Sequence, residues 1–192
     1  MMGGPRSPGL LLLLSLIPLL ALASTATKSV RHEHWTKKYD QYFSKYAKHY
    51  FGPLVDWYWF KAQGIAESGL VPGLKSSAGA KGLMQILPAT FREIQERNPH
   101  FTNIDDPRWN IAAGIYYDRM QFLKWKKGLP SQQRIAFALA SYNAGYGNIK
   151  KAHKRAEDKH GEVREWRQVA PFAPRETRLY VKRIYRLMEI EE

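Results

Sequence analysis

The sequence contains no cysteine among its 192 residues. Disulfide bonds, thiolate metal sites, cysteine nucleophiles and lipid attachment through an N-terminal cysteine are therefore excluded. Acidic residues are also few, with 17 Asp and Glu against 30 Lys and Arg, which gives a formal net charge of +13. Such a charge favours anionic partners, although it also serves solubility alone. No zinc-finger or RNA-binding motif accompanies it, so nucleic acid is not an expected partner.

Several motifs of common enzyme classes are missing as well. The glycines within residues 73–81 are not followed by Gly-Lys-Ser or Gly-Lys-Thr, so a nucleotide phosphate loop is not predicted. A serine-hydrolase elbow is absent. His32-Glu33-His34 could chelate a metal weakly but has no further ligands beside it in the sequence. The sequence therefore predicts neither a metal site nor a cofactor.

The N-terminus has the pattern of a secretory signal. Arg6 precedes an almost unbroken apolar run, Leu10 to Leu22, and small residues lead up to Ser24. This pattern predicts a signal peptide over residues 1–23 and export to the periplasm or the extracellular cell-wall space. A retained membrane anchor is the competing interpretation, but the run is shorter than the roughly 20 residues that span a bilayer, and Pro18 interrupts it. We expect no stable membrane anchor after cleavage.

The remaining chain has helical rather than strand periodicity. Residues 24–52 are predicted to form a polar lead-in and an aromatic helix starting near Trp35, which Gly52-Pro53 ends. Residues 53–192 are predicted to form one domain, and we expect a monomer. Its expected helices run over residues 54–67, from 87 to about 95, over 110–125, over 132–143 and from 176 to about 190. The charged residues 150–161 fit a solvated helix or a protruding loop. The predicted class is mainly α, with at most a small hairpin within residues 71–80.

Glu67 is the leading candidate for chemistry. It lies at the end of an apolar helical run, directly before Ser68-Gly69 and a Gly- and Ser-rich loop. The negative end of the helix dipole and an apolar environment both favour a protonated carboxyl. An acid that keeps its proton near neutral pH is what cleavage of a glycosidic bond requires. A solvated carboxylate at a helix end is the simpler alternative.

Four segments in order resemble the motifs of the soluble-type lytic transglycosylases, the SLT domain family. They are Glu67-Ser68, residues 76–85 (SSAGAKGLMQ), residues 138–145 (ALASYNAG) and residues 174–181 (PRETRLYV). Two departures are Ser77, where the family often has proline, and Ser141, where it often has alanine. The resemblance implies a mainly α, lysozyme-like α+β fold, with residues 53–192 as the catalytic domain and a cleft near any hairpin.

The resemblance also implies an activity. The expected substrate is the glycan strand of peptidoglycan (murein), cut between N-acetylmuramic acid and N-acetylglucosamine to leave a 1,6-anhydro sugar. Glu67 would be the only catalytic acid and base, because no second Asp or Glu falls in the motif segments around Glu67, Gln85 or Asn143. The residues expected to line the cleft or orient Glu67 are Ser76, Met84, Gln85, Tyr142, Asn143 and Tyr180. By spacing alone, Met84 and Tyr142 fit core positions equally well. A water-using muramidase and a non-catalytic wall-binding protein are the alternatives.

Overall fold

The computed structural model describes residues 35–125 and 128–189, and the predicted signal peptide of residues 1–23 and the residues up to His34 lie outside them. The described residues form the helices α1 (Asp40–Phe51), α2 (Tyr58–Ser68), α3 (Pro88–Arg97), α4 (Pro107–Lys124), α5 (Ser131–Ala144), α6 (Tyr146–His160), α7 (Trp166–Val169), the 3-10 helix η1 (Ala170–Phe172) and α8 (Arg175–Leu187).

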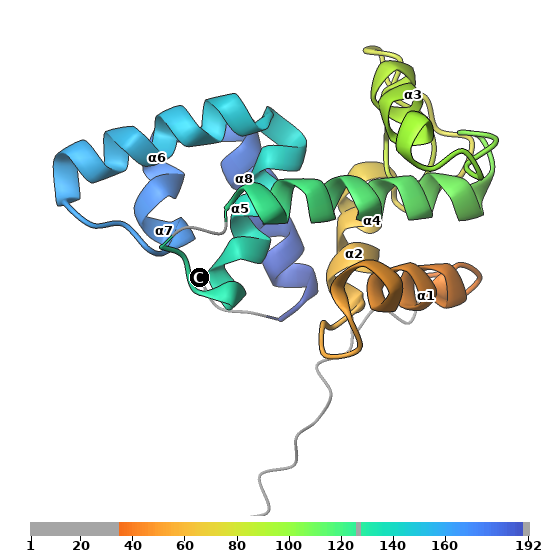
Figure 1. Ribbon diagram of the computed structural model, residues 1–192, viewed down its shortest axis with the longest axis horizontal. Helices are drawn as coiled ribbons and strands as arrows, with labels where there is room; N and C mark the ends of the chain where they lie inside the picture. Colours follow the sequence, from red (N-terminus) through yellow and green to blue (C-terminus); the bar gives the residue numbers. More distant parts are fainter. Residues whose placement is uncertain (1–34, 126–127, 190–192) are drawn as a thin grey trace, which may run out of the picture.

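The long helix α4 runs across the middle of the molecule and organises the others (Figure 1). Helix α1 packs along α4, and α5 packs against it, while α2 and α5 both contact α8. Aromatic and aliphatic side chains from these helices form one continuous core, whose largest fully buried members include Phe43, Phe60 and Phe137. Burial of this apolar surface is the main stabilising contribution, since no disulfide can form.

Most predicted helix ends are confirmed, and the starts shift by a few residues. Gly52 ends α1, and Gly145 ends α5 with a positive φ of 82°. Helix α2 starts at Tyr58 instead of residue 54, because Asp56 Oδ1 accepts a hydrogen bond from the Tyr58 N–H and the preceding residues form turns. Residues 146–160 form a continuous helix, α6, which settles the choice between helix and loop.

The predicted hairpin is present only as two isolated β-bridges, Lys75 with Lys81 and Lys81 with Ile86, and the described residues contain no strand. The mainly α prediction is therefore confirmed. The short helices α7 and η1 were not predicted from the sequence. Within residues 35–125 and 128–189, no helix combines the length and apolar character that crossing a membrane requires.

Candidate active site

Glu67 lies in the last turn of α2, where the helix ends in the way its sequence predicts. Gly69 adopts the left-handed conformation with φ of 62°, and its N–H donates to the Ile65 carbonyl. Glycine takes this conformation without strain, which makes it a common residue just past a helix end. The Glu67 side chain is partly buried, and its Oε1 accepts a hydrogen bond of 2.6 Å from the Tyr180 hydroxyl on α8. Residues 113 positions apart in the sequence thus meet at one carboxyl group.

The environment of Glu67 favours its protonated form. Burial raises the pKa of Glu67 from the ordinary value of 4.5 to about 7. The Tyr180 hydrogen bond and the positive charge of Arg183 lower this pKa, and the negative charge of Glu176 raises it, but burial has the largest effect. Arg183 also donates to the Ala66 and Ile65 carbonyls, at 3.3 and 3.4 Å, so it satisfies the C-terminal end of α2. A carboxyl group with a pKa near 7 can release and regain a proton at neutral pH.

Three side chains hold the backbone of the loop at Leu83 and Met84 against the end of α2. The Ser68 hydroxyl lies 2.9 Å from the Leu83 carbonyl oxygen, and the Tyr142 hydroxyl donates to the Met84 carbonyl at 2.7 Å. The Met84 N–H donates to Asn110 Oδ1 at 2.8 Å. Each of these groups comes from a different helix, α2, α5 or α4. The loop beside Glu67 is therefore fixed by hydrogen bonds from three sides.

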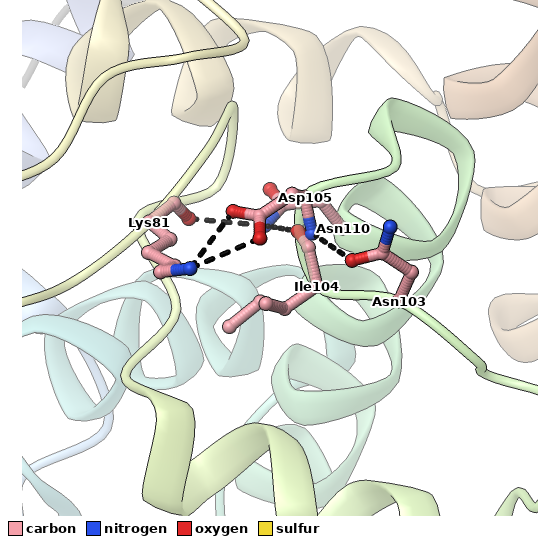
Figure 2. A network of polar contacts seen from close by, with 5 residues as sticks. All are labelled: Lys81, Asn103, Ile104, Asp105 and Asn110. Atoms are coloured by element: carbon pink, nitrogen blue, oxygen red, sulfur yellow. Dashed lines mark hydrogen bonds and ion pairs between the residues drawn. The ribbon is translucent and has the colours of Figure 1, made fainter.

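Asn110 is the centre of this arrangement. Its Nδ2 donates to the Lys81 and Ile104 carbonyls, each at 3.0 Å, while its Oδ1 accepts from Met84. Figure 2 shows the first two contacts together with the adjacent ion pair between Lys81 and Asp105. A Cβ at Gly82 would lie within 2.8 Å of three Asn110 side-chain atoms, so only glycine allows this close approach. The positive φ of 77° at Gly82 also favours glycine over any residue with a side chain.

The Met84 side chain is fully buried and fills the space between two helices. Gly114 of α4 faces it, since a Cβ there would approach Met84 Cβ and Cγ to 2.7 Å. Gly64 of α2 lies on another side, where a Cβ would meet the Met84 sulfur at 3.4 Å. Met84 is thus a core residue below the loop, and its backbone, not its side chain, is what Tyr142 and Asn110 bind.

The other predicted site residues make hydrogen bonds within residues 74–85 or between α5 and α8. Gln85 has a positive φ of 44°, and its Nε2 donates to the Gly82 and Leu74 carbonyls at 2.9 and 3.1 Å. Ser76 Oγ accepts from the Ala80 N–H at 3.0 Å and closes a tight turn. The exposed Asn143 accepts a 2.7 Å hydrogen bond from Thr177 Oγ1, which links the end of α5 to α8.

A second carboxyl group, which none of the four sequence motifs contains, interacts electrostatically with Glu67. Asp118 of α4 is only 1% exposed, and its Oδ1 accepts a 3.2 Å hydrogen bond from Gln63 Nε2. Gln63 is fully buried and precedes Glu67 by four residues on α2, so the two side chains share one face of that helix. Both helices carry other polar residues, so nothing in the sequence marks these two as partners. Among the described residues no cluster suited to a metal ion is found.

The Tyr180→Phe variant tests the contact between α8 and Glu67. Because the Tyr180 hydroxyl stabilises the carboxylate, its loss is expected to raise the pKa of Glu67. Any activity that requires protonated Glu67 should then persist to a higher pH than in the wild type. Activity measured against pH reveals this shift, and Tyr50→Phe on α1 is the control. A shift of the alkaline limb to lower pH would contradict the assignment.

Comparison with known proteins identifies the family. The family model described as the transglycosylase SLT domain matches residues 42–164. Membrane-bound lytic murein transglycosylase F of Shewanella halifaxensis is 31% identical over 137 residues, which cover 71% of this chain and 27% of that protein. The corresponding protein of Shewanella sp. strain ANA-3 is 33% identical with the same coverage. The chain thus spans about a quarter of the length of these curated relatives.

A solved structure shares the fold. The 70 kDa soluble lytic transglycosylase SLT70 of Escherichia coli superposes with a TM-score of 0.65 at 24% identity, covering 80% of this chain and 24% of that one. The identity is low, so this likeness establishes the fold alone. The family match covers more than half of the chain and includes three of the four segments singled out in the sequence. The chain therefore belongs to the SLT-domain transglycosylase family.

Proposed function

We propose that this protein is a lytic transglycosylase that cleaves the β-1,4 bond between N-acetylmuramic acid and N-acetylglucosamine in peptidoglycan, without using water. The observation that carries the proposal is Glu67, a carboxyl group with a pKa of about 7 at the end of α2, held by Tyr180. The names of the relatives support the substrate class. The predicted signal peptide supports action in the periplasm or the cell-wall space.

In the first step Glu67 acts as the acid. Its proton passes to the glycosidic oxygen as the bond from that oxygen to C1 of the muramic acid breaks. The carbonyl oxygen of the substrate's own 2-acetamido group forms a bond to C1 and takes the place of a second protein carboxylate. The Tyr180 hydroxyl donates to the carboxylate that Glu67 becomes, which stabilises the negative charge at this stage.

In the second step Glu67 acts as the base. The carboxylate removes the proton from the 6-hydroxyl of the same muramic acid residue. The 6-oxygen then bonds to C1, the bond from the acetamido oxygen to C1 breaks, and the acetamide is restored. Glu67 ends protonated and ready for another cycle, and the product carries a 1,6-anhydro ring. Neither a metal ion nor a cofactor is required.

The presence of a second carboxyl group, Asp118, near Glu67 favours the hydrolytic alternative, because ordinary glycosidases use two carboxyl groups. An inverting or retaining enzyme needs the second group exposed to the sugar or to a bound water. At 1% exposure Asp118 lies beneath the surface, and its Oδ1 is occupied by Gln63. We therefore assign Asp118 no contact with the substrate.

Mass spectrometry of the products from purified peptidoglycan sacculi tests the proposal. The 1,6-anhydro muropeptides are expected to be lighter by one water than the products of a hydrolytic muramidase that digests the same sacculi in parallel. They should also resist reduction by borohydride, since they have no free reducing end. Products that carry a reducing N-acetylmuramic acid would establish hydrolysis instead.

A further inference from the structure

We propose that Asp118 is a protonated carboxylic acid that forms a two-way hydrogen-bonded pair with the Gln63 amide, and that this pair positions the last turn of α2, so that Glu67 alone of these two buried carboxyl groups ionises. Asp118 is thus a positioning residue for the reaction. Its consequence for the reaction rests on the proposed function, whereas the pair itself does not.

The hydrogen bonds of the Asp118 and Gln63 side chains are incomplete unless Asp118 carries a proton. Gln63 Nε2 donates to Asp118 Oδ1, but Asp118 Oδ2 and Gln63 Oε1 are both buried without a hydrogen-bond partner. Both are acceptors when Asp118 is ionised, so neither can satisfy the other. If Asp118 Oδ2 is protonated, its O–H can donate a hydrogen bond to Gln63 Oε1. A single proton therefore removes both unpaired acceptors.

The ionised form has little to stabilise it. Leaving a buried polar atom unpaired costs roughly 1–3 kcal/mol, and more when the group is charged. Burial raises the pKa of Asp118 well above its ordinary value of 3.8, and the negative charge of Glu67 raises it further, against the Gln63 hydrogen bond, which lowers it. Among the described residues, the groups with an electrostatic effect on Asp118, or that feel its charge, are polar or acidic: Gln63 and Glu67 of α2, Tyr117 of α4, Tyr142 of α5 and Tyr180 of α8.

The pair lies where it can fix the last turn of α2. Gln63 lies one helical turn before Glu67, so a bond from Gln63 to α4 fixes the part of α2 that carries the acid. The neighbouring residue Tyr117 packs edge-on against the Tyr142 ring at 5.3 Å, and Tyr142 in turn binds the Met84 carbonyl. A neutral Asp118 connects these elements without adding a second negative charge beside Glu67.

The Asp118→Asn variant separates a neutral acid from an ionised one. An asparagine amide reproduces both hydrogen bonds to Gln63, so the variant should keep the wild-type rate within a few-fold and melt within about 2 °C of the wild type. The alkaline limb of the pH–activity profile, which reports Glu67, should not move. If Asp118 were ionised, removing its charge would lower the pKa of Glu67 and move that limb to lower pH. That shift would overturn the proposal.

Asp118→Leu provides the contrast, because it leaves the Gln63 amide buried without a partner. We expect it to melt roughly 4–8 °C below the wild type. We also expect a lower rate that Asp118→Asn does not show, so that the conservative change restores what the leucine loses. Equal losses of rate in the asparagine and leucine variants would show that Asp118 acts through its charge, which contradicts the pair.

Infrared spectroscopy at neutral pH gives a readout that does not depend on activity. The wild-type spectrum minus the Asp118→Asn spectrum should contain the carbonyl band of a protonated carboxyl group. Asp158→Asn is the matched control, since Asp158 is exposed and paired with Lys154 and should show only the loss of a carboxylate band. A carboxylate difference for Asp118 would overturn the proposal. If the wild type proved inactive on peptidoglycan, the spectra and melting temperatures would still decide whether the pair exists.

Discussion

Glu67→Gln is expected to lower the rate of peptidoglycan cleavage by about 10²–10⁴-fold, the usual contribution of a general acid and base. Glutamine keeps the size and a hydrogen-bond acceptor for Tyr180, but it cannot donate and recover a proton. Release of soluble muropeptides from sacculi measures the loss. Glu96→Gln, an exposed position on α3, is the matched control and should retain full activity. A Glu67→Gln variant that cleaves at the wild-type rate would remove Glu67 from the mechanism.

The same variant should bind sacculi and be well folded, which separates lost chemistry from lost structure. The folded-state pKa of Glu67, about 7, is above its ordinary value of 4.5. The wild type therefore loses stability as the pH rises from 4.5 through 7, because ionisation of a partly buried carboxyl is disfavoured in the folded state. Glu67→Gln avoids this loss. It should unfold with a free energy on the order of 1–3 kcal/mol above the wild type at pH 8, and equal to it at pH 4.

If the protein only bound the cell wall, Glu67→Gln would cause no loss of cleavage. In that case Glu67→Gln would leave both binding and the slow background release of muropeptides unchanged. The raised pKa argues against this alternative, since a binding surface gains nothing from a carboxyl group that burial destabilises when it ionises. The raised pKa of Glu67 supports the proposed proton transfer instead.

The sequence predicted the parts of the site that local signals mark. Glu67 stands before a glycine that ends a helix, and residues 76–85 contain the Gly- and Ser-rich pattern of a tight loop. Such signals depend on neighbours along the chain, so they can be read without the fold. The position of Tyr180 beside Glu67 was expected only through the resemblance, because the phase of α8 against α2 depends on packing.

The contacts that fix the loop and the pair beneath Glu67 could not be predicted from spacing. Gln63 and Asp118 are 55 residues apart, and no periodic pattern connects them. Helix α4 is buried on several faces, so its apolar residues do not form one stripe that would mark Asn110 and Asp118 as inward-facing. Met84 was equally ambiguous, and its full burial against Gly114 and Gly64 shows that its side chain belongs to the core.

Asn110→Leu is expected to be the most destabilising of the substitutions considered, at about 3–5 kcal/mol. Leucine has the same branched arrangement of heavy atoms as asparagine, but it leaves the Lys81 and Ile104 carbonyls and the Met84 N–H without their buried partner. Each such loss costs roughly 1–3 kcal/mol, part of which the loop can recover by opening to water.

Chemical denaturation and thermal melting measure the effect, which corresponds to a fall of about 10 °C in Tm for a domain of this size. Asn103→Ala is the matched control, because Asn103 is exposed and accepts one local hydrogen bond, from the Asp105 N–H (Figure 2). It should cost less than about 1 kcal/mol. Asn110 and Tyr142 both bind the Met84 backbone in the loop beside Glu67. Asn110→Leu should therefore also lose cleavage activity at temperatures where it is still folded. Stability and activity both close to those of Asn103→Ala would show that Asn110 does not hold the loop beside Glu67.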